Sequence, residues 1–282
     1  MADSFDGSNV FAALAGTVFA GHVHHLPSVE STNTLAMEAA HAGAPHGSVW
    51  VADEQTSGRG RGGHSWHSTA GDGLYVSVLL RPQMALESAL WLSLATGLAV
   101  QAAIRATTKL APDIRWPNDI LIGDKKCAGI LVESSTTPPH SDSPAMLRFV
   151  VIGVGINVNH EEFPPELTAL ATSLQKETGR SWDRSHLLTS FLRELASQID
   201  LLEAELRGQF TGGNLLTRFT ANSGWVSGKR VSVEENGGYT GVTDGLDSRG
   251  FLLVAGDDGL RHTVISGGVR SQQDRAMAEQ KA

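Results

Sequence analysis

Apolar positions follow two different spacings along the chain, and each spacing predicts its own kind of element. Between Ser185 and Leu206, large apolar residues recur every three or four positions, as they do in an amphipathic helix. Leu74–Leu80 instead alternates, with Leu74, Val76, Val78 and Leu80 on one face, which is typical of a strand. A second apolar strand is predicted at Phe149–Val158, and an almost uncharged helix at Leu90–Ala106.

Shorter apolar runs predict the remaining elements of roughly the first 220 residues. Ser31 or Thr32 caps a predicted helix that ends near His41. Short strands are predicted at 48–52 and 114–116, and a hairpin has its predicted arms at 120–122 and 127–134. Residues 1–20 carry only a weak pattern, and residues 136–144 form a predicted turn rich in Ser, Thr and Pro.

The pattern changes after Asn222. Short β-branched runs separated by Gly, Asn and Asp predict a small β-barrel, and they lie at 230–234, 239–244, 251–255 and 261–265. The elements before this point lack a regular strand–helix–strand rhythm, so the predicted class is α+β with a β appendage. The predicted divisions are a lead-in at 1–27, a catalytic domain at 28–221, the barrel at 222–270 and a polar tail at 271–282.

Composition narrows the classes of function. The formal net charge is -8, so the chain lacks the overall basic footprint of a nucleic-acid-binding protein. A single cysteine, Cys127, excludes an internal disulfide and fits a reducing compartment. The uncharged window between Glu87 and Arg105 contains Ser, Thr, Gly and Gln, which favours a core helix over a membrane span. Asp3 and Asp6 make the N-terminus a poor secretory signal. We therefore expect a cytoplasmic protein without nucleic-acid or membrane partners.

The most specific feature is a glycine-rich stretch, Asp53–Gly73, which is too long for a tight turn. Its centre reads Gln55-Thr-Ser-Gly-Arg-Gly-Arg-Gly-Gly63, and Trp66 follows. Glycines allow backbone N–H groups to approach a ligand. Arg59 and Arg61 add forked cationic donors suited to phosphate or carboxylate. A flexible solvated loop and an RGG-like nucleic-acid segment are the alternative interpretations.

A second polar cluster, Arg115-Trp-Pro-Asn-Asp119, follows a short predicted strand. Its proline fixes the chain and presents Asn118 and Asp119 from the end of that strand. Asn118 is a candidate contact to a nucleotide, and Asp119 is suited to water-mediated Mg²⁺ coordination or to orienting an amine. Lys126 lies where the next strand re-enters the core, so it can bring a point charge to a developing phosphorane. An ordinary turn and a surface hairpin lysine are the alternatives.

Glycines also interrupt an apolar strand in the run Gly153-Val-Gly-Ile-Asn157. Glycine inside a strand is typical of a close approach between the backbone and a ligand, and Asn157 adds a polar tip at the strand end. A buried structural strand explains the same residues.

The order of these motifs is more specific than any single one. The set comprises Ser31-Thr-Asn33, Gln55-x-x-Gly-Arg-Gly-Arg61, Trp116-Pro-Asn-Asp119, Lys126-x-Ala-Gly-Ile-Leu131 and Gly153-x-Gly-Ile-Asn157. Together they resemble the biotin–protein ligase family over residues 28–265. The resemblance implies a mixed-sheet, class II synthetase-like catalytic domain followed by an SH3-like barrel. The few residues before the first motif are too short for the helix-turn-helix of repressor members, so a monofunctional enzyme is expected.

The activity implied by the resemblance is that of a biotin–[biotin carboxyl-carrier protein] ligase. The biotin carboxylate attacks the α-phosphate of ATP, which yields biotinyl-5′-AMP and pyrophosphate, and a lysine of the carrier domain then displaces AMP. The expected ligands are ATP, Mg²⁺ and biotin, with no dedicated protein site for the metal. The carrier domain is the expected partner, and a sheet edge is a possible site for it or for a homodimer.

The resemblance assigns roles residue by residue. The residues expected around biotin are Ser31, Thr32, Asn33, Gln55, Arg59, Gly60, Arg61, Lys126 and Gly129. Those expected to contact the nucleotide are Trp66, Asn118 and Asn157. The expected catalytic set is Lys126, Arg59, Arg61 and Asp119. We also expect the glycine-rich loop to fold over the adenylate and to shield it from water.

Two positions depart from the family pattern, and neither is expected to alter the activity. Arg115 stands where lysine is usual, and Cys127 stands where an apolar residue is usual. A lipoate- or octanoate-protein ligase and a non-catalytic biotin-binding regulator are the rival interpretations. A zinc protein has little support, because its candidate ligands lack partners at metal spacing: His22, His24, His25, His64 and His67.

Overall fold

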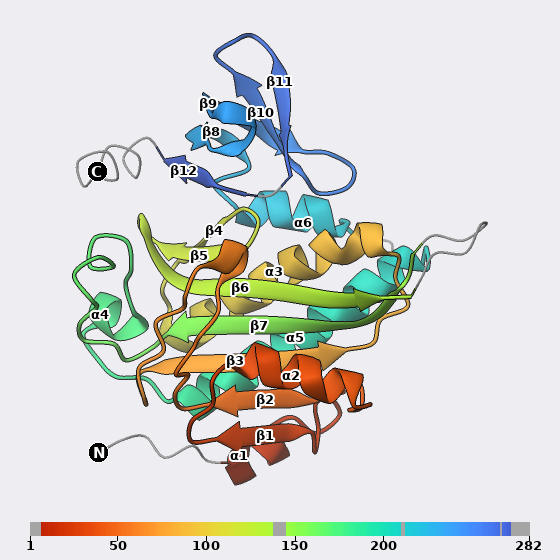
Figure 1. The fold of residues 1–282 in the computed structure, drawn as a ribbon, viewed down its shortest axis with the longest axis vertical. Helices are drawn as coiled ribbons and strands as arrows, with labels where there is room; N and C mark the ends of the chain where they lie inside the picture. The colour runs from red at the N-terminus through yellow and green to blue at the C-terminus, as the bar shows by residue number, and fades with distance from the viewer. Residues whose placement is uncertain (1–6, 138–144, 210–211, 266, 272–282) are drawn as a thin grey trace.

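Two β-sheets form the framework of the computed structural model, which describes residues 7–137, 145–209, 212–265 and 267–271. The larger sheet contains β1 (Val23–Leu26), β2 (Val49–Ala52), β3 (Gly73–Leu80), β4 (Asp113–Arg115), β5 (Asp119–Ile122), β6 (Lys125–Thr136) and β7 (Leu147–Asn157). The smaller sheet contains β8 (Ser227–Val233), β9 (Tyr239–Leu246), β10 (Leu252–Gly256), β11 (Arg261–Val264) and β12 (Val269–Ser271). The smaller sheet lies at one end of the long axis of the molecule (Figure 1).

Six α-helices accompany the sheets within the described residues: α1 (Gly7–Ala13), α2 (Thr32–His41), α3 (Ala89–Thr108), α4 (Leu174–Thr178), α5 (Arg184–Leu206) and α6 (Leu215–Asn222). The predicted helices at 32–41, 90–106 and 185–206 correspond to α2, α3 and α5. Ser31 caps α2 by accepting a hydrogen bond from the Thr34 N–H group, as predicted.

The larger sheet is mixed, as the α+β prediction requires. Its strand order is β1-β2-β3-β7-β6-β5-β4, in which β1 pairs parallel with β2 and every other neighbouring pair is antiparallel. The predicted hairpin is formed by β5 and β6. The strands β3, β7 and β6 at the centre are the longest, and they form the floor of the site described below.

Helices cover both faces of this sheet. Figure 1 shows α2 in front of it and α3 and α5 behind it. All eight residues of β3 are buried, and the predicted common face of Leu74, Val76, Val78 and Leu80 is confirmed. Leu79 belongs to the apolar cluster under α2, whereas Leu74, Val76, Val78 and Leu80 belong to the core on the side of α3 and α5.

One helical span, Leu86–Thr108, is apolar and long enough to cross a membrane by length and composition. Two thirds of it (67%) is buried inside the molecule, and α3 packs along α5. The span is therefore a core helix, as its polar residues predicted.

The N-terminal segment contains more structure than its weak pattern predicted. Val10, Leu14 and Phe19 are fully buried in the main core, and β1 adds an edge strand beside β2. The helix α6 and the strand β12 were also not predicted. Most of the predicted turn at 136–144 and all but Ser271 of the predicted tail lie outside the described residues.

The smaller sheet is antiparallel throughout, with the order β11-β10-β9-β8-β12. The four predicted strands after Asn222 are β8 to β11. Two indole N–H groups from the part of the chain around the larger sheet reach its β9–β10 turn: Trp91 donates to Arg249 O at 2.8 Å and Trp116 donates to Gly250 O at 2.9 Å. These bonds fix the smaller sheet against α3 and β4.

Candidate active site

The predicted site residues come together around one cavity of about 790 Å³. Its floor is formed by β6 and β7, and its roof by the glycine-rich loop between β2 and β3. Every residue that the sequence analysis assigned to biotin, nucleotide or catalysis lines this cavity: Ser31, Thr32, Asn33, Gln55, Arg59, Gly60, Arg61, Trp66, Asn118, Asp119, Lys126, Gly129 and Asn157.

One end of the cavity, here called the neutral end, is built from uncharged polar side chains at the start of α2. Ser31, Thr32 and Asn33 are almost fully buried there. The Thr32 N–H group donates to Gln55 Oε1 at 2.9 Å, and Gln55 Nε2 donates to Ser68 Oγ at 2.9 Å. Gln55 therefore connects the first turn of α2 to the glycine-rich loop.

Ser77 of β3 fixes the orientation of the neighbouring side chains. Its Oγ lies 2.6 Å from Asn33 Oδ1 and 2.8 Å from Thr32 Oγ1. A serine hydroxyl has one proton, and an amide oxygen has none to give. The Ser77 proton is therefore assigned to Asn33 Oδ1, and the single proton of the Thr32 hydroxyl lies between two acceptors, Ser77 Oγ and, at 3.1 Å, Gln55 Oε1. This assignment leaves the Asn33 NH₂ group pointing away from β3.

The other end, here called the charged end, is organised by Asp119 at the start of β5. Its carboxylate lies 2.6 Å from Lys126 Nζ and 2.8 Å from Arg115 Nη2. Burial acts to raise the pKa of Asp119, but the two cations outweigh it and hold that pKa below its usual value. Asp119 is therefore a carboxylate at neutral pH, and it holds the Lys126 ammonium against the cavity floor.

Arg61 extends from the glycine-rich loop to the smaller sheet. Its Nη1 donates to Asn118 Oδ1 at 3.5 Å, and a Cβ atom at Gly267 would lie 3.0 Å from the same nitrogen. Burial lowers the pKa of Arg61, while the charges of Asp119 and Glu235 act against that shift. A guanidinium stays charged in proteins, so the cavity holds a half-buried cation at this point.

Trp66 lies flat on the cavity floor, where two glycines make room for it. A Cβ atom would lie 2.4 Å from the Trp66 ring at Gly155 and 2.9 Å from it at Gly129. Lys126 Nζ lies 5.2 Å from the ring centroid, within reach of a cation–π interaction. Gly153 has the same role for Asn33, whose Oδ1 would lie 2.1 Å from its Cβ. The close approaches predicted for these strand glycines are thus made by the protein's own side chains.

The two predicted asparagine contacts to nucleotide take part in the walls of the cavity. Asn118 Nδ2 donates to Ile130 O at 3.1 Å, and Asn157 Nδ2 donates to Thr172 O at 3.0 Å. These bonds hold the β4–β5 turn to β6 and the end of β7 to the chain before α4. Their contacts to a nucleotide stay predictions.

Several residues that line the cavity or contact its lining were given no role from the sequence. Glu133 and Ser77 contact predicted site residues, and apolar side chains of the segment 163–171 line one wall. Residues 234–235 and 267–270 of the smaller sheet complete the lining. Glu133 lies two positions after the Lys126–Leu131 motif and had a visible sequence signal, because an acid within an apolar strand is unusual.

The described residues contain no group of three or more His, Cys, Asp or Glu side chains placed to hold a metal. His25, a candidate of the zinc interpretation, contacts Asp53 at 2.9 Å. Asp119, the acid at the charged end, is engaged by two cations. Mg²⁺ that arrives with the phosphates of ATP stays a prediction.

The chain is similar to known proteins in both of its parts. Residues 25–157 match the biotin/lipoate A/B protein ligase family, and residues 226–269 match the biotin protein ligase C terminal domain. The chain is 34% identical to the biotin–[acetyl-CoA-carboxylase] ligase of Mycobacterium tuberculosis, over 84% of each chain. It is also 34% identical to the bifunctional ligase/repressor BirA of Bacillus subtilis, over 90% of this chain and 75% of that one.

A solved structure shows the same fold. The biotin protein ligase of Aquifex aeolicus, in complex with biotin and ATP, superposes with a TM-score of 0.70 at 30% identity. The superposition covers 88% of this chain and 97% of the other. With these motifs, this cavity and this degree of similarity, the chain belongs to the biotin protein ligase family.

Proposed function

We propose that the protein activates biotin with ATP as biotinyl-5′-AMP and transfers biotin to a lysine of a biotin carboxyl carrier domain. The observation that carries this proposal is a single cavity with a neutral hydrogen-bonding end and a cationic end. Biotin has the matching form, with an uncharged ureido ring at one end and a carboxylate at the other. The Mycobacterium tuberculosis and Aquifex aeolicus relatives bear the names of this activity.

We assign the ureido ring to the neutral end. The hydroxyl groups of Ser31 and Thr32 and the amide of Asn33 are buried there, and Ser77 and Glu133 fix the orientation of that amide. A buried polar set of this kind rejects a ligand that cannot satisfy it, because each unpaired group costs about 1–3 kcal/mol. The dithiolane ring of lipoate offers no amide, so this end favours biotin.

We assign the adenylation step to the charged end. The biotin carboxylate must approach the α-phosphate of ATP, and both are anions. Lys126 and Arg61 supply the positive charge that lets them meet, and Lys126 then stabilises the charge that develops on the α-phosphate. The bond from that phosphorus to pyrophosphate breaks as the carboxylate oxygen bonds to it. Mg²⁺ supplies further charge neutralisation on the phosphates.

We assign to the walls of the cavity the shielding of the adenylate from water. A mixed anhydride hydrolyses unless water is kept away from it. Trp66 and the apolar side chains of Phe163, Leu167 and Leu170 lie on the side of Lys126, and we assign the adenine to that wall. The acceptor lysine must enter from the open side, attack the acyl carbon and release AMP.

The proposal also includes a cellular compartment and a partner for this reaction. The single cysteine, Cys127, is buried and free, which fits a reducing cytoplasm. The carrier domain is the acceptor we propose. The strand β1 is one of the two edges of the larger sheet, and we assign to it the docking of the acceptor or of a second copy of the chain.

The first test is biotin-dependent exchange of labelled pyrophosphate into ATP, with lipoate and octanoate as controls. It requires no acceptor protein. Exchange with biotin alone supports the proposal. Exchange with lipoate or octanoate instead would assign the chain to lipoate-protein ligation. Tight biotin binding without exchange would indicate a binding regulator.

A further inference from the structure

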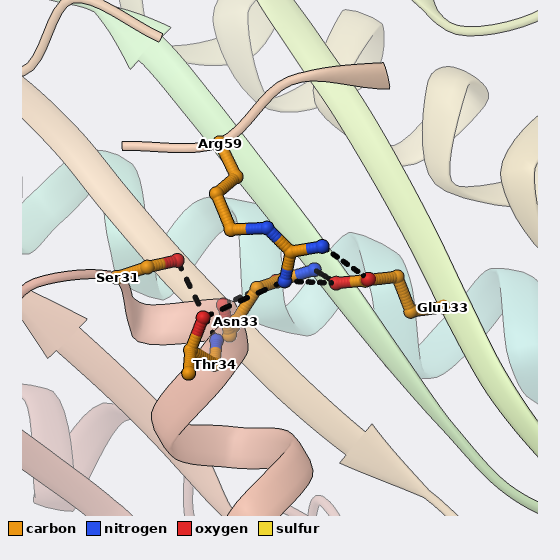
Figure 2. Close-up of polar contacts among 6 residues, drawn as sticks. Ser31, Asn33, Thr34, Arg59 and Glu133 are labelled. Carbon is orange, nitrogen blue, oxygen red and sulfur yellow. Dashed lines mark hydrogen bonds and ion pairs between the residues drawn. The ribbon is translucent and has the colours of Figure 1, made fainter. Parts of the chain in front are cut away.

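Glu133 of β6 is shared by two predicted ligand-binding residues. Its Oε2 accepts hydrogen bonds from Asn33 Nδ2 at 2.9 Å and from Arg59 Nη1 at 3.1 Å. Its Oε1 accepts a third from Arg59 Nη2 at 2.7 Å. Figure 2 shows the guanidinium of Arg59 facing this carboxylate, while Asn33 reaches it from the start of α2. One acidic side chain thus joins the neutral end of the cavity to the glycine-rich loop.

The Asn33 side of this junction is rigid. Its Oδ1 receives the proton of Ser77, and its Nδ2 is left to donate to Glu133. Gly153 leaves no space behind the amide, since a Cβ atom there would lie 2.1 Å from Oδ1. Glu133 is therefore held in place by the sheet, and its side chain is only 24% exposed.

The Arg59 side of the junction controls the loop. The two arms of the loop pair with each other, because Arg59 forms a bridge with Ser65 and the Gly60 N–H group donates to His64 O at 2.6 Å. The returning arm is attached to the floor by Trp66, which lies on Gly155. The outgoing arm is attached to the floor through the paired Arg59 side chain.

We propose that Glu133 is a positioning residue that holds Arg59, and with it the outgoing arm of the loop, over the cavity. It does not contact the reacting atoms. The inference deepens the proposed function and rests on it, because the value of a closed loop is retention of the adenylate. Two parallel charge-assisted hydrogen bonds fix the guanidinium in direction as well as in distance. Their loss should release the arm while the sheet stays folded.

The loop contains its own reporter of opening. Trypsin cleaves after arginine, and both Arg59 and Arg61 lie in the loop before glycines. We would compare the cleavage rate at these two bonds in the parent chain and in Glu133→Gln, which retains an acceptor for Asn33 but lacks the charge. The expected result is cleavage faster by roughly tenfold, with a melting temperature close to that of the parent.

Two further variants separate this role from a general loss of charge. Glu203→Gln removes the partner of Arg207 in a surface pair on α5, far from the cavity, and it should leave loop cleavage unchanged. In an Arg59→Ala background, cleavage can be followed after Arg61 alone. There Glu133→Gln should add less than about twofold, because its route to the loop is already lost.

Equal cleavage rates in Glu133→Gln and in the parent would overturn the proposal. So would tighter ATP binding in Glu133→Gln with unchanged cleavage, because Glu133 would then be a competitor for Arg59 rather than its anchor. Cleavage needs no catalysis, so a failed pyrophosphate exchange in the parent would overturn the proposed function without affecting this measurement. If exchange succeeds, faster escape of biotinyl-AMP from Glu133→Gln should accompany the faster cleavage.

Discussion

The two ends of the cavity differ in how their polar groups are paired. At the neutral end, Thr32 and Asn33 each hydrogen-bond to Ser77, and the orientation of the Asn33 amide follows from a count of donors and acceptors. At the charged end, Lys126 and Arg115 share one carboxylate, Asp119. The first end recognises a ligand by the match of directional hydrogen bonds, whereas the second attracts an anion by charge. Changes at the two ends should therefore have different signatures.

The largest expected effect is that of Lys126→Ala on the charged end. Loss of a preorganised cation that acts on the transition state should lower the pyrophosphate exchange rate by about 10²–10³-fold, with a much smaller change in biotin affinity. Exchange kinetics and calorimetric biotin binding measure the two quantities. Lys125→Ala, which removes the exposed neighbour, is the matched control and should exchange normally. Equal losses in both variants would break the assignment of Lys126.

The next effect concerns retention of the product at the charged end. Arg61 joins the loop to the smaller sheet near Gly267. Arg61→Gly therefore removes both this contact and the positive charge that the loop brings to the cavity. We expect biotinyl-AMP to escape at least about tenfold faster. Biotin should then label lysines of a bystander such as serum albumin. Clean labelling of a single carrier lysine by this variant would contradict the role given to Arg61.

Two glycines of β7 allow the two ends of the cavity to be tested separately. Gly153→Ala would displace Asn33, and Gly155→Ala would displace Trp66. Each insertion should cost about 1–3 kcal/mol of stability, since both sites are closely packed. Biotin affinity should fall mainly in the first variant, and affinity for a non-hydrolysable ATP analogue mainly in the second. Parallel losses of both affinities in both variants would mean that the ends are not independent.

The smallest effect is a dependence of stability on pH. The pKa of Asp119 lies below its usual 3.8 in the folded chain, so its ionised form contributes stability above that pH. This contribution is lost as the pH falls through the folded pKa. The destabilisation caused by Asp119→Asn should therefore shrink between about pH 7 and pH 3.

Urea unfolding at several pH values measures this difference. Ser77→Ala, at the neutral end, should destabilise the chain by a constant amount over the same range. A constant difference for Asp119→Asn as well would remove the electrostatic distinction between the ends.

The sequence predicted the cavity better than it predicted the sheet around it. The helix α5 was predicted to within one residue at its start, because a long regular stripe leaves few alternatives. The burial of both faces of β3 was not predicted, since it depends on α2 and on the distant α5 packing from opposite sides. The strand β1 was missed because two of its four residues are histidines, and only pairing with β2 makes it a strand.

In the site, too, the features that depend on distant parts of the chain were not predicted. Motifs brought Arg59, Lys126 and Asp119 to notice, because unusual residue types in a fixed order are visible locally. Glu133 received no role, although it lies two positions after the Lys126–Leu131 motif. Its partner Arg59 is 74 positions away, and only the folded sheet places the two side chains together.

The bonds from Trp91 and Trp116 to the β9–β10 turn have a consequence for how the molecule melts. They fasten the smaller sheet to α3 and to the chain that leads into the charged end. A wall held in this way is part of one cooperative unit rather than a module that unfolds alone. The cavity should therefore be lost in a single transition, and amide hydrogens in β9 and in α3 should exchange with similar protection.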